Sequence, residues 1–159
     1  MFWRRNFGFS FDILISHTQL ADAINMVRAC PNVNFILDHI AKPDIGHGVF
    51  EPWAGEIKDM AKCPNVCCKV SGMITEADHR HWRKEELKRY LDHVLHCFGC
   101  DRLLYGGDWP VVTLAGTYWQ WFEALTWVLA GLTPLELRKI FYSNAIKAYQ
   151  LDYAERKLS

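Results

Sequence analysis

The sequence has no excess of either charge and no long apolar stretch. Lysine and arginine together number 18, as do aspartate and glutamate, so the formal net charge at pH 7 is zero. Without a net field, a protein has no general attraction for nucleic acid or an acidic membrane surface. No segment approaches the ~20 continuous apolar residues of a membrane helix, and residues 1–10 lack the apolar core of a signal peptide. We therefore expect a cytoplasmic protein with no nucleic-acid or membrane partner.

The sequence also has little that suggests a disulfide framework. Half of its 159 residues are apolar, which is enough for one domain with a core of its own, so the six cysteines are not needed as cross-links. The adjacent Cys67 and Cys68 would point to opposite faces of a strand, which favours dispersed, reduced thiols. The spacing of Cys97 and Cys100 suits a metal or redox site, so a cysteine-based zinc module remains an alternative.

Apolar runs typical of buried strands alternate with helical patterns four times, at intervals of roughly 25 to 35 residues. This alternation predicts an α/β fold with four parallel strands, in a single domain with a core over 10–151 and a polar tail over 152–159. The first run is compact enough for a strand covered on both faces, and the tryptophans near 119–127 are expected to pack a helix on the sheet. The expected strands are 11–15, 35–37, 66–70 and 103–105, and the expected helices are 20–30, 53–61, 87–98 and 118–129, followed by one helix or a pair of short helices over 134–151.

Polar residues gather where each predicted strand ends. Because helical crossovers make the strands parallel, these residues would share the carboxyl edge of the sheet, where α/β folds place their sites. The residues are Ser16 with His17, Asp38 with His39, Ser71 with Gly72, and Asp108. A long polar connection, 73–83, leaves the same edge and carries Glu76, and long loops in such folds are often functional.

Asp108 is the strongest candidate because it follows Gly106 and Gly107 at a strand end. The glycines allow close approach, and a partly desolvated setting can tune the pKa of the carboxyl. The alternative is that Asp108 only caps the next helix or pairs with a lysine. His39 is the second candidate, and its alternative is a histidine held by hydrogen bonds in the core.

Five motifs together resemble the amidohydrolase superfamily, in particular its sugar-lactonase branch. They are Phe-Asp-Ile-Leu at 11–14, Phe-Ile-Leu-Asp-His-Ile-Ala-Lys-Pro at 35–43, Lys-Val-Ser-Gly at 69–72, Leu-Leu-Tyr-Gly-Gly-Asp-Trp-Pro at 103–110, and Asn-Ala at 144–145. The resemblance implies a TIM (β/α)₈ barrel of which this chain supplies about four strands, similar to strands 5–8. A complete barrel needs ~250 residues, so we expect a fragment, the carboxyl-terminal half of such a barrel.

The resemblance also implies a function in carbohydrate metabolism: hydrolysis of a sugar lactone of the fucono or rhamnono type, or of a related ester. Asp108 and His39 would be the catalytic residues, with Asp108 as general base. They would also be the metal ligands for a divalent cation, most often zinc, in a full-length protein. The expected contacts to the small-molecule substrate are Lys42, Trp109 and Glu76.

The family's His-x-His pair on the first strand has no counterpart in this sequence. His79 and His81 have the spacing, but no apolar run precedes them. The alternative function is therefore a non-catalytic fragment or pseudoenzyme, without a metal of its own, that self-associates through open sheet edges.

Overall fold

The computed structural model describes residues 9–151, and within them four strands form one parallel sheet. The strands lie in sequence order, with Phe11 opposite Phe35, Phe35 opposite Val66, and Cys68 opposite Leu103. All four carboxyl ends therefore meet at one edge, and the predicted α/β alternation is confirmed. The strands are β1 (Phe11–Ile13), β2 (Phe35–Leu37), β3 (Val66–Val70) and β4 (Leu103–Tyr105).

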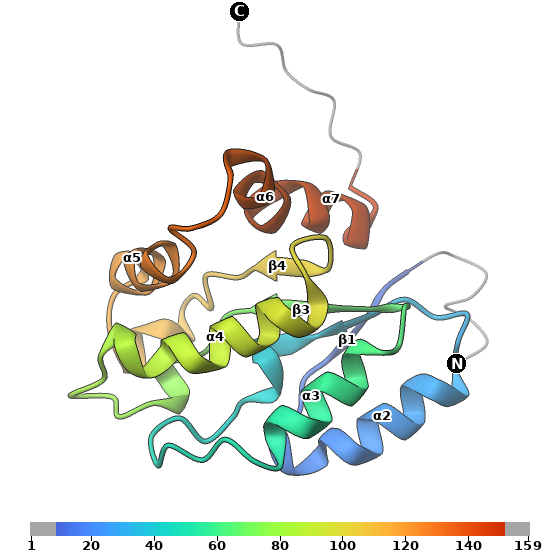
Figure 1. The fold of residues 1–159 in the computed structure, drawn as a ribbon, viewed down its shortest axis with the longest axis horizontal. Helices are drawn as coiled ribbons and strands as arrows, with labels where there is room; N and C mark the ends of the chain where they lie inside the picture. Colours follow the sequence, from blue (N-terminus) through green and yellow to red (C-terminus); the bar gives the residue numbers. More distant parts are fainter. Residues whose placement is uncertain (1–8, 152–159) are drawn as a thin grey trace, which may run out of the picture.

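Amphipathic helices cover one face of this sheet. In α2, residues Leu20, Ala23, Ile24 and Val27 are buried at the spacing of one helical face, and in β3 alternate residues join the same core. Figure 1 shows α2, α3 and α4 lying side by side along the sheet. The longer helices are α2 (Leu20–Ala29), α3 (Trp53–Ala61), α4 (Lys84–Phe98) and α5 (Tyr118–Val128).

Short helical turns complete the connections between these elements. Four of them are η1 (His17–Gln19), η2 (Asp38–Ala41), η3 (Ile74–Glu76) and η4 (Val111–Leu114). Each of these turns follows a strand in the chain, so together they surround the carboxyl edge of the sheet. The polar groups that flank the strands are therefore carried by short, ordered segments.

The last helix of the described residues folds back to the first strand. A capping box at Thr133 starts α6 (Pro134–Arg138), and a π-helical turn, η5 (Lys139–Ser143), leads into α7 (Asn144–Tyr149). The Asn144 amide donates to the carbonyls of Cys100 and Leu103, each at 2.7 Å, which holds α7 against β4. The Tyr149 hydroxyl then donates to Asp12 Oδ2 at 2.9 Å. These bonds connect α7 to β4 and to β1, the two outer strands of the described sheet.

Two predictions about packing were wrong in part. The first strand ends at Ile13, and it is not covered on both faces, since Ile13 is buried whereas Asp12 on the other face is exposed. The reason is that one face of the strand is polar, because Asp12 pairs there with Lys69 and accepts a hydrogen bond from the Tyr149 hydroxyl. In α5, Trp121 packs in the core as expected, whereas Trp119 is 66% exposed. The predicted polar tail, 152–159, and most of the segment considered for a signal peptide lie outside the described residues.

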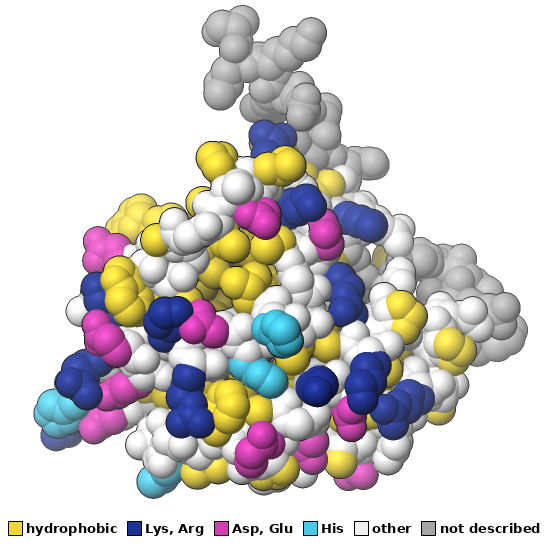
Figure 2. All heavy atoms as spheres, in the orientation of Figure 1, with side chains coloured by type: hydrophobic (Ala, Val, Ile, Leu, Met, Phe, Trp, Pro, Cys, Tyr) yellow, Lys and Arg dark blue, Asp and Glu magenta, His cyan; other side chains and the backbone are white. Residues whose placement is uncertain are grey.

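Acidic and basic side chains are interspersed over the face in Figure 2, as expected for a chain of zero net charge. None of the helices in residues 9–151 has the length and apolar character needed to cross a membrane.

Candidate active site

His39 stands at the carboxyl end of β2, in a backbone segment of unusual conformation. Residues His39, Ile40, Ala41 and Lys42 all have positive φ, between 46° and 60°. This left-handed region costs a non-glycine residue about 1–2 kcal/mol, so surrounding contacts must hold the segment in place. One such contact is local, because the Lys42 amide donates to the His39 carbonyl at 2.8 Å.

Asp108 follows β4 and also has a left-handed backbone, with a φ of 54°. The two glycines before it allow the close approach that the sequence suggests. A Cβ on Gly106 would lie 2.8 Å from the Ser71 Cβ, and a Cβ on Gly107 would lie 2.6 Å from the Tyr118 ring. The indole of Trp121 donates to the Gly106 carbonyl at 2.9 Å, so α5 holds this corner of the chain.

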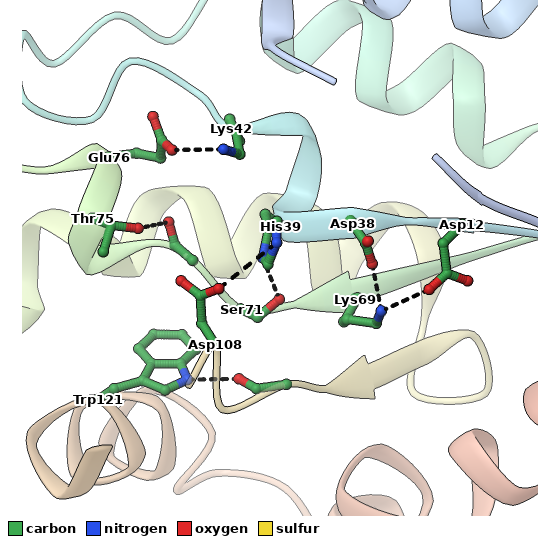
Figure 3. Close-up of polar contacts among 12 residues, drawn as sticks. Asp12, Asp38, His39, Lys42, Lys69, Ser71, Thr75, Glu76, Asp108 and Trp121 are labelled. Carbon is green, nitrogen blue, oxygen red and sulfur yellow. Dashed lines mark hydrogen bonds and ion pairs between the residues drawn. The ribbon is translucent and has the colours of Figure 1, made fainter. Parts of the chain in front are cut away.

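The structure brings His39 and Asp108 together, as Figure 3 shows. His39 Nε2 lies 3.8 Å from Asp108 Oδ1, and both side chains are largely buried. On the other side of the ring, His39 Nδ1 is hydrogen-bonded to Ser71 Oγ at 2.8 Å. Ser71 is fully buried. The ends of β2, β3 and β4 therefore each contribute one side chain to this cluster.

Burial raises the pKa of Asp108 above its ordinary value because desolvation disfavours the charged carboxylate. The neighbouring His39 and Lys42 groups oppose this shift, and Asp38 adds to it, but the net direction is upward. A carboxyl group with a raised pKa holds a proton more strongly than an ordinary aspartate does. It is correspondingly a stronger general base once it is ionised.

The three predicted substrate contacts lie around this pair in different settings. Lys42 Nζ is 3.7 Å from Glu76 Oε1, so the two loops that carry them are joined by an ion pair. Trp109 follows Asp108 directly, and its side chain is 71% exposed. Lys42 and Glu76 therefore border the cluster as a pair, while Trp109 presents an apolar surface to solvent beside it.

Sequence reasoning missed a second polar cluster, centred on Lys69 of β3. Its ammonium lies 2.5 Å from Asp38 Oδ1 and 3.2 Å from Asp12 Oδ2. Burial alone would lower the pKa of Lys69, but its bonds to Asp38 and Tyr149 raise it, and the net direction is upward. The available signal was a lysine inside a predicted parallel strand, because parallel sheets are usually covered on both faces and a covered lysine needs a charged partner. Ser71 was also missed as the partner of His39.

Other candidates from the sequence lie apart from the pair. His79 and His81 are exposed and are bonded to the Thr75 carbonyl and to Asp78. His17 is hydrogen-bonded to the Lys42 carbonyl at 2.8 Å. The six cysteines are free thiols, and burial raises the pKa of Cys68, so its thiol is strongly favoured over the thiolate.

A divalent cation could be held by two groups of this site. His39 Nε2 and Asp108 Oδ1 are near enough to contact one ion, and imidazole and carboxylate are both ligands that zinc accepts. Within residues 9–151, however, His, Cys, Asp and Glu side chains form no group of three suited to a metal. A catalytic zinc usually has three protein ligands, so the described residues fit as part of a donor set rather than a whole one.

A family model described as amidohydrolase matches residues 5–151. The chain belongs to the amidohydrolase family. This confirms the resemblance read from the five motifs. Among curated relatives, an L-fucono-1,5-lactonase of Burkholderia ambifaria is 34% identical over 147 residues, which are 90% of this chain and 50% of that protein. The chain spans about half the length of the curated relatives it matches.

Solved structures of this family share the fold. A crystal structure of an amidohydrolase from Burkholderia multivorans with bound HEPES superposes with a TM-score of 0.87 at 30% identity, covering 94% of this chain and 55% of that one. A second crystal structure from the same organism, with zinc bound, gives a TM-score of 0.87 at 28% identity and the same coverage. The predicted fold class, four strand–helix units of a TIM barrel, is therefore confirmed.

Proposed function

We propose that this amidohydrolase chain carries the hydrolytic site of a sugar lactonase. The observation that carries the proposal is the pairing of His39 Nε2 with Asp108 Oδ1 at 3.8 Å on the carboxyl edge of the sheet. A relative 34% identical to this chain is named as an L-fucono-1,5-lactonase, which supports a lactone as the substrate. The cytoplasm and carbohydrate metabolism are the setting we propose for the reaction.

In the proposed reaction, Asp108 acts as general base toward water. The carboxylate takes one proton from the water as its oxygen attacks the lactone carbonyl carbon. Its raised pKa makes it a better proton acceptor than an exposed aspartate. As the ring C–O bond breaks, the same proton passes from Asp108 to the departing oxygen, which yields the open hydroxy acid. Asp108 thus ends the cycle in its starting form.

His39 is proposed to stabilise the carbonyl oxygen as it becomes negative. In this role, Nε2 carries a proton and donates it in a hydrogen bond, while Nδ1 accepts from the Ser71 hydroxyl. Because the Ser71 hydroxyl holds Nδ1, the orientation of the imidazole is fixed before substrate binds. A fixed donor needs no reorganisation as charge develops.

Lys42, Glu76 and Trp109 are proposed to bind the sugar. The ammonium and the carboxylate, 3.7 Å apart, can donate and accept hydrogen bonds with neighbouring hydroxyl groups. The exposed indole of Trp109 offers a flat apolar surface beside the reacting carbonyl. These contacts would orient the lactone and leave the chemistry to Asp108 and His39.

His39 and Asp108 would be the residues of this chain that hold a divalent cation, with zinc as the proposed metal. When bound, such a cation supplies Lewis-acid polarisation of the carbonyl. In that case His39 presents an unprotonated Nε2, and the Nδ1 proton is donated to Ser71. The two roles of His39 therefore differ in which ring nitrogen carries the proton.

The test is lactone hydrolysis by the purified chain, with L-fucono-1,5-lactone and other sugar lactones as probes, in zinc and in chelator. We expect the wild-type chain to hydrolyse the lactone. Asp108→Asn should reduce this turnover by roughly 10²-fold or more, the usual scale for loss of a general base. Asp59→Asn, at an exposed pair with Lys62, serves as the matched control and should keep full activity. Equal turnover in Asp108→Asn, or no turnover by the wild-type chain in either condition, would overturn the proposal and leave the non-catalytic alternative.

A further inference from the structure

We propose that His17 is a positioning residue for the site, acting together with Trp53 as a clamp on the left-handed segment 39–42. His17 belongs to η1, after β1, and Trp53 begins α3. Within residues 9–151, neither side chain has a hydrogen bond or ion pair with His39 or Asp108. Each instead binds a backbone carbonyl of the segment that carries His39 and Lys42.

The segment needs such a clamp because its conformation is intrinsically unfavourable. Four consecutive non-glycine residues have φ near +50°, and at about 1–2 kcal/mol each the strain is large for so short a turn. Ile40 and Ala41 within it are fully buried. Buried carbonyls in an irregular turn lack the partners that a helix or sheet would supply, so side chains must provide them.

The two donors fill this need from different elements. Trp53 Nε1 donates to the Ile40 carbonyl at 2.7 Å, in a fully buried bond. His17 Nδ1 lies 2.8 Å from the Lys42 carbonyl. A carbonyl oxygen can only accept, so Nδ1 of His17 must carry the proton in this bond. Trp53 therefore holds the middle of the segment, and His17 holds its end.

The geometry explains how the clamp acts on the side chains at the site. With the backbone held left-handed, His39 is directed to Ser71 and Asp108, and Lys42 is directed to Glu76 (Figure 3). A relaxation of this turn into ordinary conformations would rotate both side chains away from the places they occupy. That this placement serves lactone hydrolysis rests on the proposed function, whereas the clamp itself does not.

The experiment measures amide hydrogen exchange in the full chain. The reporter is the Lys42 amide, bonded to the His39 carbonyl, and the reference is the Cys68 amide of β3, bonded to the Arg102 carbonyl. In His17→Leu, which removes the donor and keeps the bulk, we expect the Lys42 amide to exchange about tenfold faster relative to Cys68. His17→Gln retains an N–H donor and should restore most of the protection. Trp53→Phe, which removes the second donor, should accelerate the same amide.

Equal protection in wild-type and His17→Leu would overturn the proposal. So would a parallel acceleration of Lys42 and Cys68, because it would indicate a global loss of stability rather than a local clamp. Activity gives a separate readout: the clamp predicts a higher KM for the lactone in His17→Leu that His17→Gln reverses. If the wild-type chain has no lactonase activity, the proposed function fails while the exchange result still decides the clamp.

Discussion

Gly72 is the residue that makes room for the His39 ring. A Cβ built on Gly72 would lie 2.7 Å from His39 Nδ1, far inside normal contact, and the backbone of Gly72 has a φ of +64°. We therefore expect Gly72→Ala to displace the imidazole from Ser71. The matched control is Gly48→Ala, since Gly48 has a φ of +68° but open space around its Cβ position.

Both substitutions carry the same backbone strain, so their difference isolates the contact with His39. We expect Gly72→Ala to lose about 1–3 kcal/mol more unfolding free energy than Gly48→Ala, as overpacking in a closed site does. Urea denaturation measures this difference. Equal losses in the two variants would show that the ring moves aside without penalty.

Asp108→Asn should stabilise the protein at neutral pH while it removes activity. Because the folded-state pKa of Asp108 is raised, folding favours its protonated form. The stability of the wild type should therefore fall as pH rises through the interval between the ordinary and the raised pKa, and the asparagine variant should lack this loss. Asparagine also tolerates the left-handed backbone of this position.

The measurement for this prediction is thermal unfolding of both proteins across the acidic range. The advantage of Asp108→Asn should be present at neutral pH and should shrink as pH falls. A variant that is less stable than the wild type at pH 7 would contradict the assignment of a desolvated carboxyl.

Lys69→Met should be strongly destabilising because it leaves two carboxylates near each other without their cation. Asp38 is mostly buried, and Lys69 lies within 3.2 Å of both it and Asp12. For a largely buried ion pair that loses one partner, we expect a loss of about 3 kcal/mol. Lys62→Met breaks an exposed pair of similar distance with Asp59 and should lose less than about 1 kcal/mol. Denaturant titration measures the loss of unfolding free energy in both variants. Equal losses would show that Asp38 finds another donor.

Self-association through the sheet edges is the remaining prediction about partners. Within residues 9–151, β1 pairs with β2 alone and β4 with β3 alone, so each has one unpaired side in the described sheet. We expect the molar mass measured by light scattering to rise with protein concentration. A mass of 18.5 kDa that stays constant up to high concentration would argue against association.

The sequence predicted the central part of the fold well. The bounds of β2, β3 and β4 match the expected runs, because each is a short apolar segment closed by polar residues or glycine. The run at 11–15 was predicted too long, because β1 is paired with β2 only over Phe11–Ile13. Asp108 was chosen from its place after two glycines at a strand end, and the family motifs strengthened the choice of His39. The structure brings these two side chains together.

The supporting residues could not be read from local patterns. The left-handed conformation of 39–42 is held by bonds from η1 and α3, and none of its residues is a glycine that would signal it. Lys69 and Asp12 are 57 positions apart, so their pairing depends on the sheet register rather than on spacing. Such partners are defined by the tertiary fold.

The bonds between α7 and the first strand have a consequence for the order in which the chain can fold during synthesis. Tyr149 is bonded to Asp12 across 137 positions, and the Ser10 hydroxyl is bonded to the Ala148 carbonyl across 138. During synthesis β1 leaves the ribosome before α7, which carries both partners. These two bonds therefore form only after almost all of residues 9–151 have been made, whereas the pairing of β1 with β2 needs no part of α7.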